Sequence, residues 1–247
     1  MTDLQGRFDL MERISAALSA FTLDWFHRLG EVQVEEKGHA DYVSRIDREA
    51  EALARDIIAN AFPGDQIVGE EQGGSAANDC WVIDPIDGTA NYLSGLPIWA
   101  VSIAYLQGGK PVIGIIAMPA IGFVVSGGTE FDLRVDGTLP PITNTAPVVF
   151  GVGRNPVWSA ADRMACESGL EAKGYNIVSV GSCASALAMV AAGRLVGYVE
   201  HNIKLWDCAA GAVLCRVAGL ASQIHPCGAD FDVHIKAGPA AILSQLD

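Results

Sequence analysis

The chain has 247 residues, which is enough for one large domain or two closely packed ones. Half of the residues are hydrophobic and 18% are charged, so the composition fits a globular protein with a sizeable core. The formal net charge of −13 argues against nucleic acid as the main partner. No apolar run approaches the roughly 20 residues of a membrane span, so we expect no membrane partner.

Two amphipathic helices are predicted at the N-terminus. Apolar residues at helical spacing run from about residue 4 to residue 29, and Gly30 is a stop signal. After a polar loop, a second helix is predicted from Ile46, with Ser44 as its N-cap and Pro63-Gly64 as its end.

Strands are predicted next, followed by an alternation of helices and strands. Apolar, β-rich runs cover residues 67–69, 81–84, 98–106, 112–118 and 121–125. Beyond residue 141, helices at 160–173, 184–192 and 206–218 alternate with strands at 177–180 and 195–200. We therefore predict an α+β half over residues 1–140 and an α/β half over residues 141–247.

The string WVIDPIDGT at residues 81–89 is the most informative segment of the chain. The proline after Asp84 cannot donate to a sheet ladder, so the strand is predicted to stop near Asp84. Asp84 and Asp87 then stand at the mouth of a buried strand, next to Gly88 and Thr89. Carboxylates collect hard cations, and a glycine lets backbone N–H groups approach phosphate oxygens closely. The string therefore predicts a metal-assisted phosphatase.

Three further acidic sites lie at the ends of predicted elements, where side chains can converge on one crevice: Asp47, Glu70 with Glu71, and Asp207. Taken singly, each is explained as a helix cap or a first-turn acid. An acidic protein that binds phosphate needs a source of positive charge, and bound divalent cations supply it.

The histidines at 39, 201, 225 and 234 show no metal-ligand spacing. Six scattered cysteines without a CxxC pair, and a start unlike a signal peptide, are typical of a cytoplasmic protein.

Over nearly its whole length the chain resembles the inositol monophosphatases and their lithium-sensitive relatives. The motifs that carry the resemblance, in order, are Lys37…Asp47, Gly69-Glu70-Glu71, Trp81…Asp84-Pro85-Ile86-Asp87-Gly88-Thr89, Gly181-Ser182…Ala184, Glu200 and Trp206-Asp207. The resemblance implies a mixed α+β and α/β, layered αβαβα sugar-phosphatase-type fold, a homodimer, and about two or three Mg²⁺ ions in each active site. A loop at residues 38–41 that is about one residue short leaves the role of Lys37 open.

The resemblance also implies a set of site residues. Mg²⁺ would be held by Glu70, Asp84, the carbonyl of Ile86, Asp87 and Asp207. Asp47 and Thr89, hydrogen-bonded to each other, would orient the attacking water and with Glu70 form the catalytic group. The phosphate would lie against Asp87, Gly88 and Thr89, and the alcohol would lie against Gly181, Ser182, Ala184 and Glu200.

The implied reaction is hydrolysis of a small polyol phosphate, with myo-inositol 1-phosphate in first place, by attack of a metal-activated water. Histidinol phosphate is an alternative, since the Ser-Gly-Leu-Pro continuation at residues 94–97 is shared with such phosphatases. A sugar bisphosphate is another, and a 3′-phosphonucleotide is a weaker one. A non-catalytic binding protein of the same fold is the alternative from another class, and the intact acidic residues argue against it.

Overall fold

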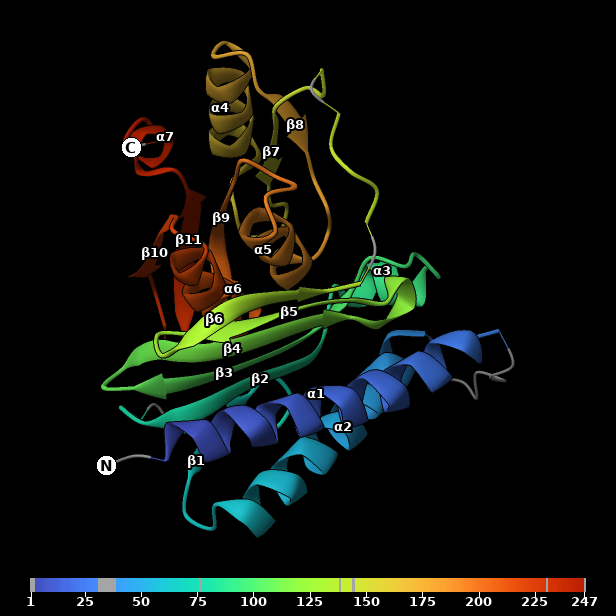
Figure 1. Cartoon of the computed structure of the whole chain (residues 1–247). Helices are drawn as coiled ribbons and strands as arrows, with labels where there is room; N and C mark the ends of the chain where they lie inside the picture. Colours follow the sequence, from blue (N-terminus) through green and yellow to red (C-terminus); the bar gives the residue numbers. More distant parts are fainter. Residues whose placement is uncertain are drawn as a thin grey trace.

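The computed structural model describes residues 3–30, 39–75, 77–137, 139–143, 145–229 and 231–246, without the side chains of 39–44. Five layers are stacked in the order helices, sheet, helices, sheet, helices (Figure 1). This is the layered αβαβα architecture that the resemblance implied. The expectations for Lys37 and for the side chain of His39 lie outside the described part.

The first layer consists of helices α1 (Leu4–His27) and α2 (His39–Ala61). Their apolar faces form one hydrophobic cluster with one face of the first sheet, as the periodicity predicted. Asp3 caps α1 by accepting a hydrogen bond from the N–H of Gly6 at 2.8 Å. The prediction that Ser44 caps α2 was wrong, because the helix begins at His39. The sequence prediction assigned residues 39–43 to a loop, whereas the backbone there is already helical.

The first sheet has six strands in chain order: β1 (Gln66–Gly69), β2 (Cys80–Asp87), β3 (Ala100–Gln107), β4 (Lys110–Met118), β5 (Phe123–Gly128) and β6 (Phe131–Asp136). Strands β1 and β2 are parallel, and the remaining neighbours are antiparallel. A short 3₁₀ turn, η1 (Pro119–Ile121), joins β4 to β5. Side chains alternate between the faces: Trp81 packs with the N-terminal helices, and Val82 packs with the middle helices.

Strand β2 does not stop near Asp84, as the sequence had predicted, but continues to Asp87. Its register with β3 shifts between Asp84 and Asp87, and its pairing with β1 ends at Ile83. Pro85 therefore lies in a bulge, where the strand pairing needs no hydrogen bond from residue 85, so the missing N–H costs nothing. The bulge interrupts the regular strand between Asp84 and Asp87, so both carboxylates lie where the regular pairing ends.

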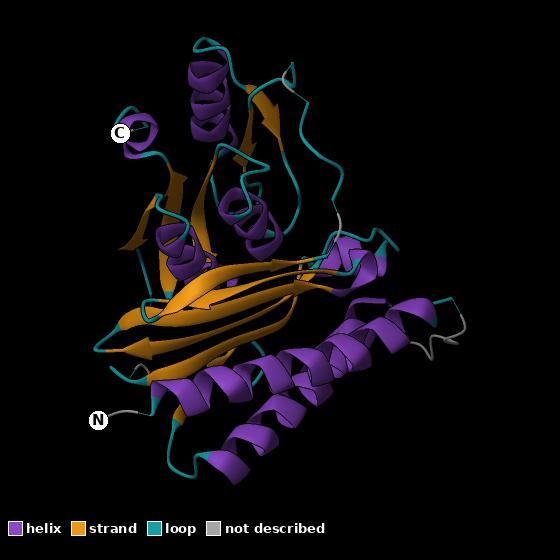
Figure 2. Ribbon diagram, viewed as in Figure 1, coloured by secondary structure: helices purple, strands orange, loops and turns teal. Residues whose placement is uncertain are grey.

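Helices α5 (Cys183–Ala191) and α6 (Leu205–Val217) form the middle layer, between the two sheets (Figures 1 and 2). Their sequences are rich in alanine, which allows the helix axes to lie close together. A Cβ added at Gly211 of α6 would lie 2.3 Å from Cβ of Leu187 in α5. This close approach fixes α6 against α5.

The second sheet has the strand order β10-β11-β9-β7-β8. Its strands are β7 (Val149–Val152), β8 (Asn176–Val178), β9 (Gly197–Lys204), β10 (Ala221–Pro226) and β11 (Asp232–Gly238). On β9, Tyr198 faces the middle helices, whereas Val199 faces the outer layer of α4 (Ala160–Glu171) and α7 (Ala240–Leu243).

The proposed division into residues 1–140 and 141–247 remains a prediction. Within the described residues, no helix is both long enough and apolar enough to cross a membrane.

Candidate active site

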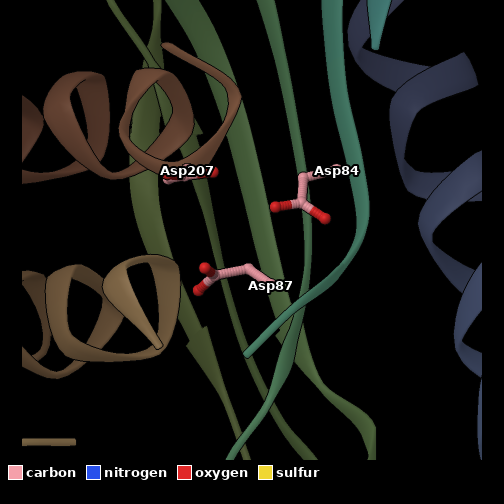
Figure 3. Close-up of side chains that lie close together, drawn as sticks. All are labelled: Asp84, Asp87 and Asp207. Carbon is pink, nitrogen blue, oxygen red and sulfur yellow. The ribbon is translucent and has the colours of Figure 1, made fainter. Parts of the chain in front are cut away.

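Three aspartates from two distant parts of the chain meet at one end of the first sheet. Asp84 and Asp87 come from the bulged end of β2, and Asp207 comes from the first turn of α6 (Figure 3). One carboxylate oxygen of each lies within 4.8 Å of the others. Asp84 and Asp87 are buried, and Asp207 is half-buried. The sequence predicted this convergence correctly.

Backbone and hydroxyl donors hold these carboxylates in place. Asp84 Oδ1 accepts a hydrogen bond from the N–H of Ile86 at 3.0 Å, and Asp207 Oδ2 accepts one from the N–H of Lys204 at 2.9 Å. Asp87 Oδ2 accepts a hydrogen bond from the hydroxyl of Ser182. The same oxygen accepts one from the N–H of Ala184 at 2.7 Å. The start of α5 therefore positions Asp87.

Burial and mutual repulsion raise the pKa values of this cluster. Desolvation first, and then repulsion by neighbouring carboxylates, hold the pKa of Asp84 and of Asp207 well above the usual range. Burial also raises the pKa of Asp87 to about 7, although the donors Ser182 and Ala184 oppose the rise. Such a cluster is unfavourable as three anions, and a bound divalent cation removes the repulsion.

Glu70 follows β1 and lies close enough to Asp84 for its charge to raise the pKa of that aspartate. Burial and repulsion by Glu71 raise the pKa of Glu70. A cation between the two carboxyl groups would offset their repulsion. The donor set of carboxylate oxygens fits a hard cation such as Mg²⁺.

Asp47 lies on α2 and is buried to 3% exposure. Within the described residues, its Oδ1 has no hydrogen-bond partner. Burial, and then repulsion by Glu70, raise the pKa of Asp47 to about 9. The expected hydrogen bond between Asp47 and Thr89 is not made here, because the Thr89 hydroxyl donates to the carbonyl of Ile86 at 3.3 Å.

Gly88 forms the turn between β2 and the short helix α3 (Thr89–Leu93). Its φ of +95° is in the left-handed region, and an added Cβ would lie 2.9 Å from Cβ of Ser182. Only glycine fits this position without strain. As the N-cap of α3, Gly88 precedes first-turn N–H groups that have no intrahelical acceptor.

A cavity of about 240 Å³ opens beside the aspartates. It is lined by Asp87, Arg154, Asn155, Gly181, Ser182, Cys183, Tyr198, Glu200, Asn202, Ile203, Lys204 and Asp207. Of the four residues expected around the alcohol, three line the cavity, and Ala184 does not. A larger cavity of about 830 Å³ elsewhere is lined by none of the acidic site residues.

Glu200 is 6% exposed, and both of its carboxylate oxygens have protein donors. Asn155 Nδ2 donates to Oε1 at 3.0 Å, and the hydroxyl of Tyr198 donates to Oε2 at 2.5 Å. Gly153 leaves room for this carboxylate, because an added Cβ would lie 2.1 Å from Cδ of Glu200. The side chain is therefore rigid.

Sequence reasoning missed three residues around the site. Asn155 carried no signal, because its partner Glu200 is 45 positions away. Arg154 is exposed at the cavity and makes no ion pair or hydrogen bond with any described residue. Glu51 did carry a signal, since it follows Asp47 by one helical turn beside the predicted apolar face of α2.

The raised pKa values predict an unusual stability profile in EDTA. Between the unfolded pKa of about 4 and the raised folded values, the folded protein holds protons that the unfolded chain has released. The melting temperature should therefore fall as the pH rises from about 5 to about 8, and Mg²⁺ should restore it most at the high end. Differential scanning fluorimetry across this range measures the slope.

The control for this profile is a variant that removes a surface carboxylate. Asp84→Asn should flatten the slope, whereas Asp136→Asn, at an exposed position on β6, should leave it unchanged. A melting temperature that is constant or rises over this range in EDTA would contradict the account of the cluster.

The chain is similar to known proteins over most of its length. Residues 10–240 match the inositol monophosphatase family. The chain is 52% identical to the uncharacterized protein y4fL of Sinorhizobium fredii, over 96% of this chain and 86% of that protein. It is 33% identical to a fructose-1,6-bisphosphatase/inositol-1-monophosphatase of Aquifex aeolicus, over 78% of this chain and 76% of that protein. The solved structure of Mycobacterium tuberculosis SuhB is similar with a TM-score of 0.77 at 30% identity, over 97% of this chain and 93% of that one. This chain belongs to the inositol monophosphatase family.

Proposed function

We propose that this protein is a Mg²⁺-dependent phosphatase that hydrolyses a small phosphomonoester. The observation that carries the proposal is the convergence of Asp84, Asp87 and Asp207 from two distant segments into one buried cluster. Family membership supports the same reaction class.

Mg²⁺ would be held by Glu70, Asp84, Asp87, Asp207 and the carbonyl oxygen of Ile86. When bound, Mg²⁺ supplies the positive charge that lowers the pKa of a water molecule and stabilises the phosphoryl oxygens. The start of α5 keeps Asp87 in place through Ser182 and Ala184.

Other residues of the chain would position the water and the phosphate. The free Oδ1 of Asp47 is an acceptor for a proton of the water, and the Thr89 hydroxyl would help to aim it. The N–H groups of Gly88 and Thr89, at the start of α3, would donate to phosphate oxygens. No covalent intermediate is needed, because the contribution of these groups is positioning.

A binding protein without activity is the alternative from another class. It would gain nothing from burying mutually repelling carboxylates, which cost stability unless a cation offsets them. The presence of Asp47, Glu70 and Thr89 around the cluster supports an enzyme.

The favoured substrate is a small polyol phosphate, with myo-inositol 1-phosphate in first place. Glu200 is held rigidly at the cavity, and each oxygen of a carboxylate can accept more than one hydrogen bond. Hydroxyl groups of a polyol would donate to it, as the side chains of Asn155 and Tyr198 already do.

A second candidate is a sugar bisphosphate. Arg154 is exposed at the same cavity without a partner among the described residues, and a guanidinium group there would bind a second anionic group. The bisphosphatase name of the Aquifex relative supports this candidate. Histidinol phosphate, whose amine would pair with Glu200, remains a third candidate, although the cation Arg154 lines the same cavity.

We also propose that the protein works as a cytoplasmic homodimer. Its six cysteines form no disulfide, which supports a reducing compartment. The homodimer is inferred from the family resemblance alone.

The first experiment is phosphate release from myo-inositol 1-phosphate with Mg²⁺ or with EDTA. We expect activity only with Mg²⁺, and Asp207→Asn should lower kcat/KM by more than about 100-fold, because a neutral amide binds a hard cation weakly. Asp162→Asn is the matched control, since Asp162 is likewise an acid in the first turn of a helix, α4, but lies outside the site. Full turnover in EDTA, or wild-type activity of Asp207→Asn, would exclude the proposed function.

The second experiment identifies the substrate class with two variants. If the substrate is a neutral polyol phosphate, Arg154→Gln should have no effect, and Glu200→Gln should have a mild one. If it is a bisphosphate, Arg154→Gln should raise KM by about 10- to 100-fold, the equivalent of a charge-assisted hydrogen bond. If it is histidinol phosphate, Glu200→Gln should raise KM instead.

The measurements are steady-state kinetics on myo-inositol 1-phosphate, fructose 1,6-bisphosphate and histidinol phosphate. Arg13→Gln, at an exposed position on α1, is the control for loss of a surface arginine. Unchanged kinetics of both cavity variants on every ester would show that neither residue contacts the substrate.

A further inference from the structure

Glu51 is a buried carboxylate of α2 that lies outside the cavity, and its side chain has 0% exposure. Its Oε1 accepts a hydrogen bond from Nε of Arg55 at 2.7 Å. Its Oε2 accepts bonds from the backbone N–H groups of Glu71 at 2.8 Å and Gln72 at 3.4 Å. Helix α2 is therefore attached directly to the turn that follows β1.

This turn carries Glu70, and it is tied to α2 at both ends. At its start, Gly69 leaves room for the Glu51 carboxylate, because an added Cβ would lie 2.4 to 2.6 Å from Cδ, Oε1 and Oε2. At its end, Nη2 of Arg55 donates to the carbonyl of Gly73 at 2.7 Å. The N–H of Gly69 closes the turn by donating to the same carbonyl at 3.1 Å.

A charged residue at position 51 adds electrostatic repulsion to the neighbouring carboxyl groups. Repulsion by Glu51 contributes to the raised pKa of Asp47 and of Glu70, and Arg55 is its one ion-pair partner within the described residues. A buried ion pair is weak evidence for stability, since apolar residues of similar size often serve as well. A carboxylate can, however, accept bonds from two consecutive N–H groups and a guanidinium group at once, which an apolar side chain cannot.

We propose that Glu51 is a positioning residue that sets the Mg²⁺ affinity of the site by fixing the turn that presents Glu70 to Asp84. It acts through the backbone of Gly69, Glu71 and Gln72, and it touches neither substrate nor cation. The same helix supplies Asp47, one turn before Glu51, so α2 aligns two parts of the site at once. This inference depends on the proposed role of Glu70 as a Mg²⁺ ligand.

The test is Glu51→Gln, because an amide keeps the shape but offers only one acceptor oxygen. Isothermal titration should show Mg²⁺ bound about 10- to 100-fold more weakly than by wild type, as for other residues that orient metal ligands. Amide hydrogen exchange should accelerate at Glu71 and Gln72. In activity assays the variant should be less active than wild type at low Mg²⁺ but should reach the wild-type kcat at saturating Mg²⁺, since Glu51 takes no part in the chemical step.

The matched control is Glu49→Gln. Glu49 also pairs with an arginine on α2, Arg45, at the same four-residue spacing, but this pair is exposed. The control should bind Mg²⁺ as wild type does. Mg²⁺ affinity and amide exchange of Glu51→Gln equal to those of wild type would overturn the proposal, and so would a kcat that stays low at saturating Mg²⁺.

A second variant tests the same contact without changing a carboxylate. Gly69→Ala should displace the Glu51 side chain and weaken Mg²⁺ binding in the same way, whereas Gly30→Ala, which meets nothing within 4 Å, should not. Normal Mg²⁺ binding by Gly69→Ala would contradict the proposal. If the wild type releases no phosphate but the Glu51→Gln variant binds Mg²⁺ more weakly than the wild type, the inference is supported and the proposed function is contradicted.

Discussion

The structure depends on one electrostatic constraint: several carboxyl groups are held together in a site from which water is largely excluded. Asp84, Asp87 and Asp207 repel one another, and burial raises the pKa of each. Without a cation, the folded protein must therefore either hold protons on these carboxyl groups or tolerate their repulsion. The cluster is unfavourable by itself, and a bound divalent cation would offset the repulsion, so the proposed function and the stability would depend on the same residues.

The layers of the fold supply the rigidity that this cluster requires. The bulge in β2 places Asp84 and Asp87, and α6 brings Asp207 to them across the middle layer. Helix α6 can do so because Gly211 allows it to lie directly against Leu187 of α5. The start of α5 binds Asp87, and α2 holds the turn of Glu70, so each carboxyl group is fixed by a different element.

Sequence patterns predicted the long helices and seven of the strands, but they missed β6, β7, β10 and β11 and most of the detailed bonding. Helical periodicity located α1, α5 and α6 to within a few residues, because each buries a continuous apolar face. The same approach placed the start of α2 too late, because residues 39–43 were assigned to a loop. Pro85 misled the strand prediction because a bulge tolerates a residue without an N–H.

The composition of the site could be predicted because its carboxylates are concentrated in recognisable strings. The partners of those carboxylates could not, since they come from remote positions: Asn155 for Glu200, and Ser182 for Asp87. The position of the Thr89 hydroxyl, on Ile86 and not on Asp47, depends on local geometry that no spacing rule contains.

The most direct test of the central claim is to locate a metal. Crystals grown with Mn²⁺, which favours the same oxygen ligands as Mg²⁺, would show bound ions by anomalous scattering. The account predicts an anomalous peak in contact with the carboxylates of Asp84, Asp87 and Asp207. No peak among these three carboxylates at saturating Mn²⁺ would contradict it.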